Sequence, residues 1–179
     1  MTAMKIKKTA LMKAAELLAY REHSEAELKR KLLARKYDSA EVDETIDKLK
    51  QHNYLDDAEL CRQQFENFYA EGKLSVRQIV AKLIQRGFDK DFIEQLIPED
   101  FYEHELQAAT LALTKKFKTV DENFNATSEK ADASRSSNTE TNRMQRHVAF
   151  RAKAWQFLSG RGFDGEIISA AVENFLQGD

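Results

Sequence analysis

Apolar residues recur along most of the chain at intervals of three and four, which is the spacing of a helix that buries one face. Leu28 and Leu32 form one such pair, and Ile79 and Leu83 form another. Each pair follows a serine that has Glu or Gln three residues later, as in a capping box. The pattern therefore predicts amphipathic helices with capped starts.

A short sequence at the end of the predicted helices occurs three times. "RKYD" stands at 35–38, and "RGFD" stands at 86–89 and again at 161–164. Glycine can take the left-handed conformation that ends a helix, and Asp can accept N–H bonds at the start of the next one. Each tetrapeptide is therefore predicted to be a helix–turn–helix corner, with its aromatic residue packed beneath the corner.

The similarity around these corners extends over longer segments, which indicates an internal repeat. Residues 24–46 align with 75–97 at an offset of 51, and 150–172 follow at a further offset of 75. The matched apolar positions are Leu32, Leu83 and Leu158; Tyr37, Phe88 and Phe163; Val42, Ile93 and Ile168; and Ile46, Ile97 and Val172. A further helix precedes each matched segment, so we expect an all-α fold of three tandem three-helix repeats that form an elongated, curved molecule.

The predicted repeats divide the chain at two points. Repeat 1 covers 1–55, repeat 2 covers 56–98, and repeat 3 covers 99–179. Within repeat 3, residues 118–143 are rich in Ser, Thr, Asn and acidic groups and poor in large apolar side chains. Because such a segment gains little from burial, we predict a flexible polar insertion there.

Composition agrees with a helical protein outside the membrane. The 179 residues include only six Gly and one Pro, and 32% of them are charged. No run of 18 apolar residues is present, and charges interrupt the N-terminal segment where a signal peptide needs apolar residues. The single cysteine, Cys61, has no internal partner and is predicted to fill the core. These features predict a cytoplasmic protein without a membrane segment, and we expect a monomer.

Charge is distributed unevenly along the chain. The net charge is −2, yet residues 1–36 hold ten Lys and Arg against four Asp and Glu. A helix that projects several cations attracts an acidic partner or nucleic-acid phosphates. The candidate partner-binding residues are Lys29, Arg30, Lys31, Arg35, Lys36, Arg77, Lys82 and Arg86. The alternative is a solvated helix face, and Arg35, Arg86 and Arg161 also suit helix C-termini, where the dipole favours cations.

Candidate catalytic and metal-binding groups all have a structural interpretation. Asp56 and Asp57 precede a predicted helix, so capping explains them better than catalysis. The four histidines are scattered without a Cys pair, and no Gly-rich phosphate loop is present. Trp155, Phe157 and Phe163 have helical spacing beside Leu158 and are predicted to be core rather than a stacking platform for bases. We therefore predict no enzyme activity, no cofactor and no metal.

Three segments together are similar to the RecX family of recombination regulators. They are "LLAYREHSEAELKRKL" (17–32), "YLDDAEL" (54–60) and "EGKLSVRQIVAKLIQRGF" (71–88), in order and at the family's spacing. The resemblance covers about 9–117 and 144–176. It implies a cytoplasmic bacterial protein that binds the RecA filament on single-stranded DNA.

The same resemblance implies what such binding does. A family member lies along the groove of the RecA filament, inhibits its ATPase, strand-exchange and coprotease activities, and so restrains recombination and the SOS response. This interpretation also includes a weak direct contact between the protein and DNA. The alternative is a DNA-binding protein built from helix-turn-helix-like repeats, which the acidic second and third repeats disfavour.

Overall fold

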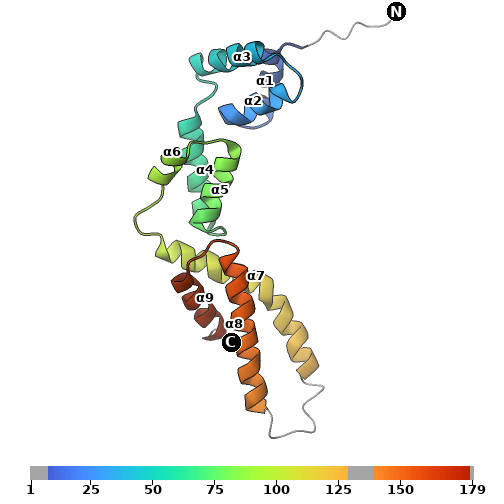
Figure 1. Cartoon of the computed structure of the whole chain (residues 1–179), viewed down its shortest axis with the longest axis vertical. Helices are drawn as coiled ribbons and strands as arrows, with labels where there is room; N and C mark the ends of the chain where they lie inside the picture. Colours follow the sequence, from blue (N-terminus) through green and yellow to red (C-terminus); the bar gives the residue numbers. More distant parts are fainter. Residues whose placement is uncertain (1–7, 129–138, 178–179) are drawn as a thin grey trace, which may run out of the picture. The chain divides into compact units, whose positions relative to one another are not determined.

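The computed structural model describes residues 8–128 and 139–177, and all regular structure in this part of the chain is helical (Figure 1). The predicted all-α fold is therefore confirmed. The described helices are α1 (Ala10–Tyr20), α2 (Glu25–Leu33), α3 (Ser39–Gln51), α4 (Asp57–Glu71), α5 (Val76–Arg86), α6 (Lys90–Gln95), α7 (Tyr102–Ser128), α8 (Thr139–Ser159) and α9 (Gly165–Gln177).

Two serines begin helices as the capping pattern predicts, but only one forms a complete capping box. The Ser75 Oγ accepts a bond from the Gln78 N–H at 3.2 Å, and the Gln78 Oε1 accepts one from the Ser75 N–H at 3.3 Å. The Ser24 Oγ likewise accepts a bond from the Glu27 N–H, at 3.1 Å. The Glu27 carboxylate forms ion pairs with three cations, so α2 gains its cap from the serine.

All three corners end a helix in the same way. The residue at the second corner position has a positive φ in each copy: 63° at Lys36, 95° at Gly87 and 83° at Gly162. The N–H of the aromatic residue that follows donates to the carbonyl of the leucine five residues earlier, as in a Schellman motif. These bonds are Tyr37 to Leu32, Phe88 to Leu83 and Phe163 to Leu158.

The chain groups into two compact units. One combines Met1–Glu66 with Val80–Leu96, and the other combines Asn67–Ile79 with Ile97–Asp179. Because these units divide α4 and α5, they differ from the predicted division at 55/56 and 98/99, which stays a prediction. The core of the first unit includes Ala14, Leu28, Leu32, Val42, Ile46, Leu49 and Leu55. The core of the second includes Ala108, Ala109, Leu113, Ala154, Leu158, Phe163, Ile167, Ile168, Ala171 and Val172.

Part of the predicted polar insertion is helical. The backbone of α7 continues through 118–128, and α8 already includes 139–143, whereas the remainder of the insertion, 129–138, lies outside the described residues. The prediction of a loop at 118–128 and 139–143 was wrong. The polar sequence alone did not end the helices, because these stretches contain neither Gly nor Pro and include several good helix formers.

The corner at Lys36 offers a test of backbone strain. A non-glycine residue at φ 63° is strained, and the two matching corners have glycine there. We expect Lys36→Gly to raise the free energy of unfolding by about 0.5–1 kcal/mol, measured by urea denaturation. Lys36→Ala removes the same charge but keeps the strain, so it should bring no such gain. An equal gain from both variants would show that charge, and not φ, sets the effect.

Candidate functional site

Three cations surround one nearly buried carboxylate at the start of α2. Glu27 is only 6% exposed. The Arg21 guanidinium binds it with both terminal nitrogens, one of them 3.0 Å from the Glu27 Oε2. The Lys31 Nζ lies 3.2 Å from the Glu27 Oε1, and the Arg86 Nη2 lies 3.7 Å from the Glu27 Oε2. Two of the predicted partner-binding residues, Lys31 and Arg86, therefore belong to an internal ion cluster.

Hydrogen bonds from neighbouring cations keep the Glu27 carboxylate ionised. Burial alone would raise the pKa of Glu27, but hydrogen bonds from Arg21 and Lys31 outweigh it and hold the pKa of Glu27 at about 2. His23 lies beside the cluster, with its Nδ1 2.8 Å from the Arg21 carbonyl oxygen and its Nε2 2.7 Å from the Lys31 Nζ. Burial lowers the pKa of His23, so the neutral ring donates to the carbonyl and accepts from the ammonium group.

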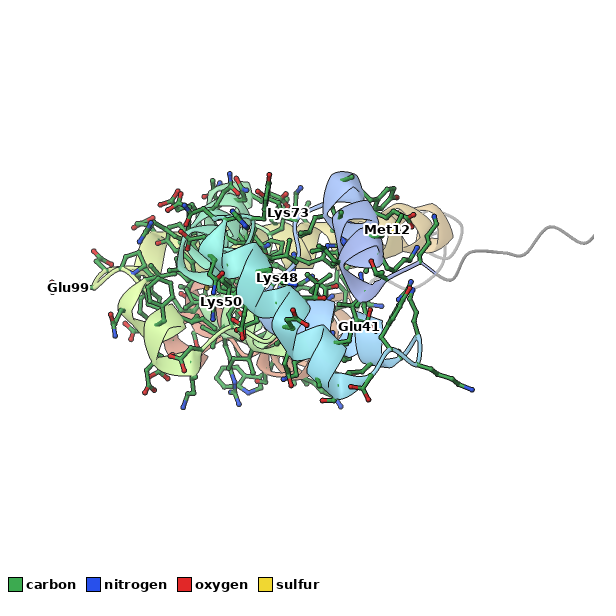
Figure 2. The ribbon with its side chains drawn as sticks, turned by 90° about the horizontal axis from the view of Figure 1, so that it is seen from above. Met12, Glu41, Lys48, Lys50, Lys73 and Glu99 are labelled. Carbon is green, nitrogen blue, oxygen red and sulfur yellow. The ribbon has the colours of Figure 1, made fainter. Side chains whose placement is uncertain are left out.

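Other cations near α2 are also paired. The Lys29 Nζ lies 2.5 Å from Asp43 of α3, and this contact raises the pKa of Lys29. Lys48 and Lys50 lie on α3 (Figure 2). The Lys48 Nζ is 2.6 Å from Glu44, and the Lys50 Nζ is 2.7 Å from Glu25. Lys29 is therefore held by a carboxylate, as are the two lysines of α3.

Three of the predicted residues keep their charge available at the C-terminal end of α2. Arg30, Arg35 and Lys36 are exposed, and none of them takes part in an ion pair among the described residues. The Arg35 guanidinium donates to the Lys31 carbonyl at 2.8 Å, which confirms its predicted role near a helix C-terminus. The structure thus brings three unpaired cations together at one helix end.

The two remaining candidates lie on α5. Arg77 and Lys82 are both exposed. The carbons of the Arg77 side chain lie over Gly162, where a Cβ would come within 2.6 Å of the Arg77 Cδ. Arg77 belongs to the second compact unit and Lys82 to the first.

A pair of matching hydrogen bonds was not predicted from the sequence. The Ser24 Oγ, at the start of α2, donates to the Arg86 carbonyl at the corner after α5. The Ser75 Oγ, at the start of α5, donates to the Arg161 carbonyl at the corner after α8, at 2.8 Å. Each capping serine therefore also binds the corner of the next segment of the sequence repeat. In the sequence, the serine and the corner arginine recur together in the alignment of the repeats. This recurrence could have indicated the contact between them.

An acidic side chain adds a second contact at the start of α2 and another at the start of α5. The Asp57 Oδ1 accepts a bond from the Glu25 N–H at 2.9 Å, and the Glu105 Oε1 accepts one from the Val76 N–H at 2.5 Å. Burial raises the pKa of both carboxyl groups. The Asp56 Oδ1 accepts a bond from the Glu59 N–H at 2.9 Å, which confirms the predicted cap of α4 at Asp56, whereas Asp57 does not cap this helix. Asp57 instead binds the first residue of α2.

The aromatic prediction for α8 holds only in part. Phe163 is 5% exposed and belongs to the core, and Phe157 packs against that core. Trp155 is 48% exposed, so its assignment to the core was wrong. The Arg161 guanidinium lies over the Phe157 ring, 4.1 Å from its centroid, in a cation–π contact.

The described residues also bear on three other features: a reactive thiol, a metal site and a membrane segment. Cys61 is fully buried, as predicted, and burial raises the pKa of its thiol to about 11. Between residues 8 and 177, leaving out 129–138, no group of three or more His, Cys, Asp or Glu side chains is placed to hold a metal ion. Nor is any described helix both long and apolar enough to cross a membrane.

Comparisons with known proteins agree on one family. Residues 10–49 match the family domain described as RecX, first three-helix domain. The regulatory protein RecX of Vibrio parahaemolyticus is 34% identical over 110 residues, which cover 60% of this chain and 68% of that protein. The regulatory protein RecX of Deinococcus radiodurans is 31% identical over 164 residues, covering 92% of this chain and 67% of that protein.

A solved structure shows the same fold. The crystal structure of RecX from Lactobacillus salivarius superimposes with a TM-score of 0.63 and covers 93% of this chain and 94% of its own, at 15% sequence identity. On the sequence relatives and on this shared fold, the chain belongs to the RecX family of regulatory proteins.

Proposed function

We propose that this protein is a non-enzymatic regulator that binds the RecA filament on single-stranded DNA. Binding inhibits the ATPase, strand-exchange and coprotease activities of the filament and so restrains recombination and the SOS response in the cytoplasm. Family membership supports a regulatory role, and the relatives carry the name of regulatory proteins. One structural observation carries the choice of surface: Arg30, Arg35 and Lys36 form an exposed cationic end of α2 without a carboxylate partner among the described residues.

These three residues are better suited to bind a partner than the other candidate residues. A cation that already binds a carboxylate must give up that ion pair before it meets a partner, whereas a cation without an ion pair does not. Lys29, Lys31 and Arg86 are paired with Asp43 or Glu27. We therefore assign the first contact with the filament to the end of α2, with Arg77 and Lys82 as further contacts along α5.

The protein acts through this surface as a monomer, and less than one molecule per recombinase subunit is enough for inhibition. Long-range attraction between the cationic end of α2 and the negatively charged filament speeds encounter, so association should slow as salt increases.

Charge reversal at the end of α2 tests the proposed surface. We expect the double variant Arg30→Glu with Lys36→Glu to bind a preassembled RecA filament at least about tenfold more weakly than the native protein, since each change turns attraction into repulsion. Binding is measured as the anisotropy change of a labelled filament. Neither side chain has an ion pair among the described residues, so the variant should keep the native circular dichroism and urea midpoint.

A matched control separates the site from the net charge. Lys73→Glu with Lys90→Glu changes the net charge equally at two other exposed lysines and should bind the filament about as well as the native protein. If the α2 variant is folded and binds as tightly as the control, the proposed surface is wrong. The same titration on single-stranded DNA without RecA shows whether the protein is instead a DNA-binding protein.

A further inference from the structure

One face of α8 presents large side chains to solvent rather than to the core. Met144 is 69% exposed, Val148 is 62% exposed and Trp155 is 48% exposed. Arg151 is exposed between them. Their spacing of four, three and four residues places the four side chains on one stripe about three turns long. Among the described residues, this stripe is a largely apolar face that no other helix covers, rather than a set of scattered surface residues.

The stripe borders a hollow between α8 and α9, two helices that pack against each other in the second unit (Figure 1). The hollow has a volume of about 120 Å³, and Arg151, Trp155, Ser169, Val172 and Glu173 line it. Ligand pockets generally measure about 300–1,000 Å³, so this one has room for a single side chain of a partner rather than for a small molecule.

The sequence run that contains the stripe carries charge of one sign, although Glu173 of α9 also lines the hollow. Residues 141–163 include five Lys and Arg and no Asp or Glu, in a chain whose net charge is −2. Arg151 and Lys153 are exposed, and no ion pair among the described residues includes either of them. The acidic residues of 99–179 lie before and after this run.

We propose that the α8 stripe, defined as Met144, Val148, Arg151 and Trp155, is a docking surface for an acidic amphipathic segment of a protein partner. Exposed apolar side chains on one helix face suit the apolar face of such a segment, while Arg151 and Lys153 attract its carboxylates. Trp, Met and Arg are also the residue types most enriched at protein interfaces. This surface consists of other residues than the end of α2, and the proposal does not depend on the proposed filament contact.

The apolar members of the stripe favour a protein over a nucleic acid. Trp155 and Arg151 alone could stack on a base and bind phosphate. Met144 and Val148 gain nothing from phosphates, however, and both are more exposed than Trp155. Burial of both, together with Trp155 at the C-terminal end of the stripe, needs an apolar partner surface.

Trp155 is the only tryptophan in the chain, so its fluorescence reports directly on this surface. The probe is a synthetic peptide of about 16 residues, long enough to cover the stripe as a helix, with Leu and Phe on one face and Glu on both flanks. We expect saturable binding with a blue shift of the Trp155 emission, because the peptide displaces water from the ring. A scrambled peptide of the same composition and a version with Lys in place of Glu should bind at least about tenfold more weakly.

Variants locate the binding on the stripe through the anisotropy of the labelled peptide. Val148→Asp and Arg151→Glu should each weaken binding at least about tenfold, and both side chains lie outside the core, so these variants should stay folded. Lys115→Glu, an exposed lysine of α7, is the matched control and should bind normally.

Three results would overturn the proposal. Equal binding of the acidic, scrambled and Lys-containing peptides would show unspecific adsorption. Tighter binding of oligo(dT) than of the acidic peptide, with the same shift of Trp155 emission, would make the stripe a nucleic-acid surface. A shift that appears on concentration of the protein alone, together with dimers in sedimentation, would assign the stripe to a second copy of this chain.

Discussion

Replacement of Gly87 by alanine should lower the free energy of unfolding by about 3 kcal/mol. Gly87 has a φ of 95°, which an L-residue with a side chain rarely adopts. A Cβ at this position would also overlap the Cβ of Ala26, in the first turn of α2. Backbone strain and overpacking therefore act at the same residue. Urea denaturation followed by circular dichroism measures the loss.

Two controls separate these two causes. Gly160→Ala introduces a Cβ at a glycine where φ is not positive and where the nearest atom, the Gln156 carbonyl oxygen, lies 3.3 Å away, so its cost should stay below about 1 kcal/mol. Ala26→Gly in the Gly87→Ala background removes the overlap but not the strain and should restore part of the stability. If Gly87→Ala proved as stable as Gly160→Ala, this result would contradict the close contact between the start of α2 and this corner.

Removal of the charge at the centre of the ion cluster should have the second largest effect. Glu27→Gln leaves Arg21, Lys31 and Arg86 without their shared carboxylate, and removal of one partner of a buried ion pair is costly. Because the three cations remain partly exposed, solvent screens part of the loss. We expect the free energy of unfolding at pH 7 to fall by about 2 kcal/mol.

The dependence on pH has a definite sign. The pKa of Glu27 is about 2 in the folded protein and 4.5 in the reference state, so the unfolded chain binds more protons between these values. The stabilisation from Glu27 is therefore fully present above about pH 5 and declines as the pH falls toward 2. In urea titrations at several pH values, the difference between the native protein and Glu27→Gln should shrink over this window.

An exposed glutamate provides the matching control for the pH series. Glu66 lies on α4 and is exposed, so Glu66→Gln should differ little from the native protein at any of these pH values. If the difference between Glu27→Gln and the native protein is independent of pH between 5 and 2, the Glu27 carboxylate does not hold the three cations as described.

Local features of the fold could be predicted from the sequence because they depend on neighbouring residues. The start of α2 at Ser24, the left-handed corners and the buried Leu28 and Leu32 all follow from spacings of three to five residues. The continuation of α7 through 118–128 could not be predicted in this way. Polarity argued for a loop there, but the absence of Gly and Pro left nothing to end the helix.

The candidate site was harder to predict because its contacts join distant parts of the sequence. The bond from Ser24 to the Arg86 carbonyl and the approach of Arg86 to Glu27 each connect residues about sixty positions apart, and no local spacing reports them. These contacts give Arg86 a structural role, whereas the ion pair of Lys31 with Glu27 is local, at a spacing of four residues. The exposure of Trp155 was missed for a related reason, since helical spacing shows that a face exists but not which neighbour covers it.

The most direct test of the proposed function is DNA-dependent ATP hydrolysis by the RecA recombinase while this protein is titrated in. A parallel anisotropy titration uses the single-stranded DNA without RecA. We expect loss of ATP hydrolysis at less than one molecule of this protein per RecA subunit, with weak binding to the DNA alone. Unchanged ATP hydrolysis at saturating concentrations of folded protein would contradict the proposed function.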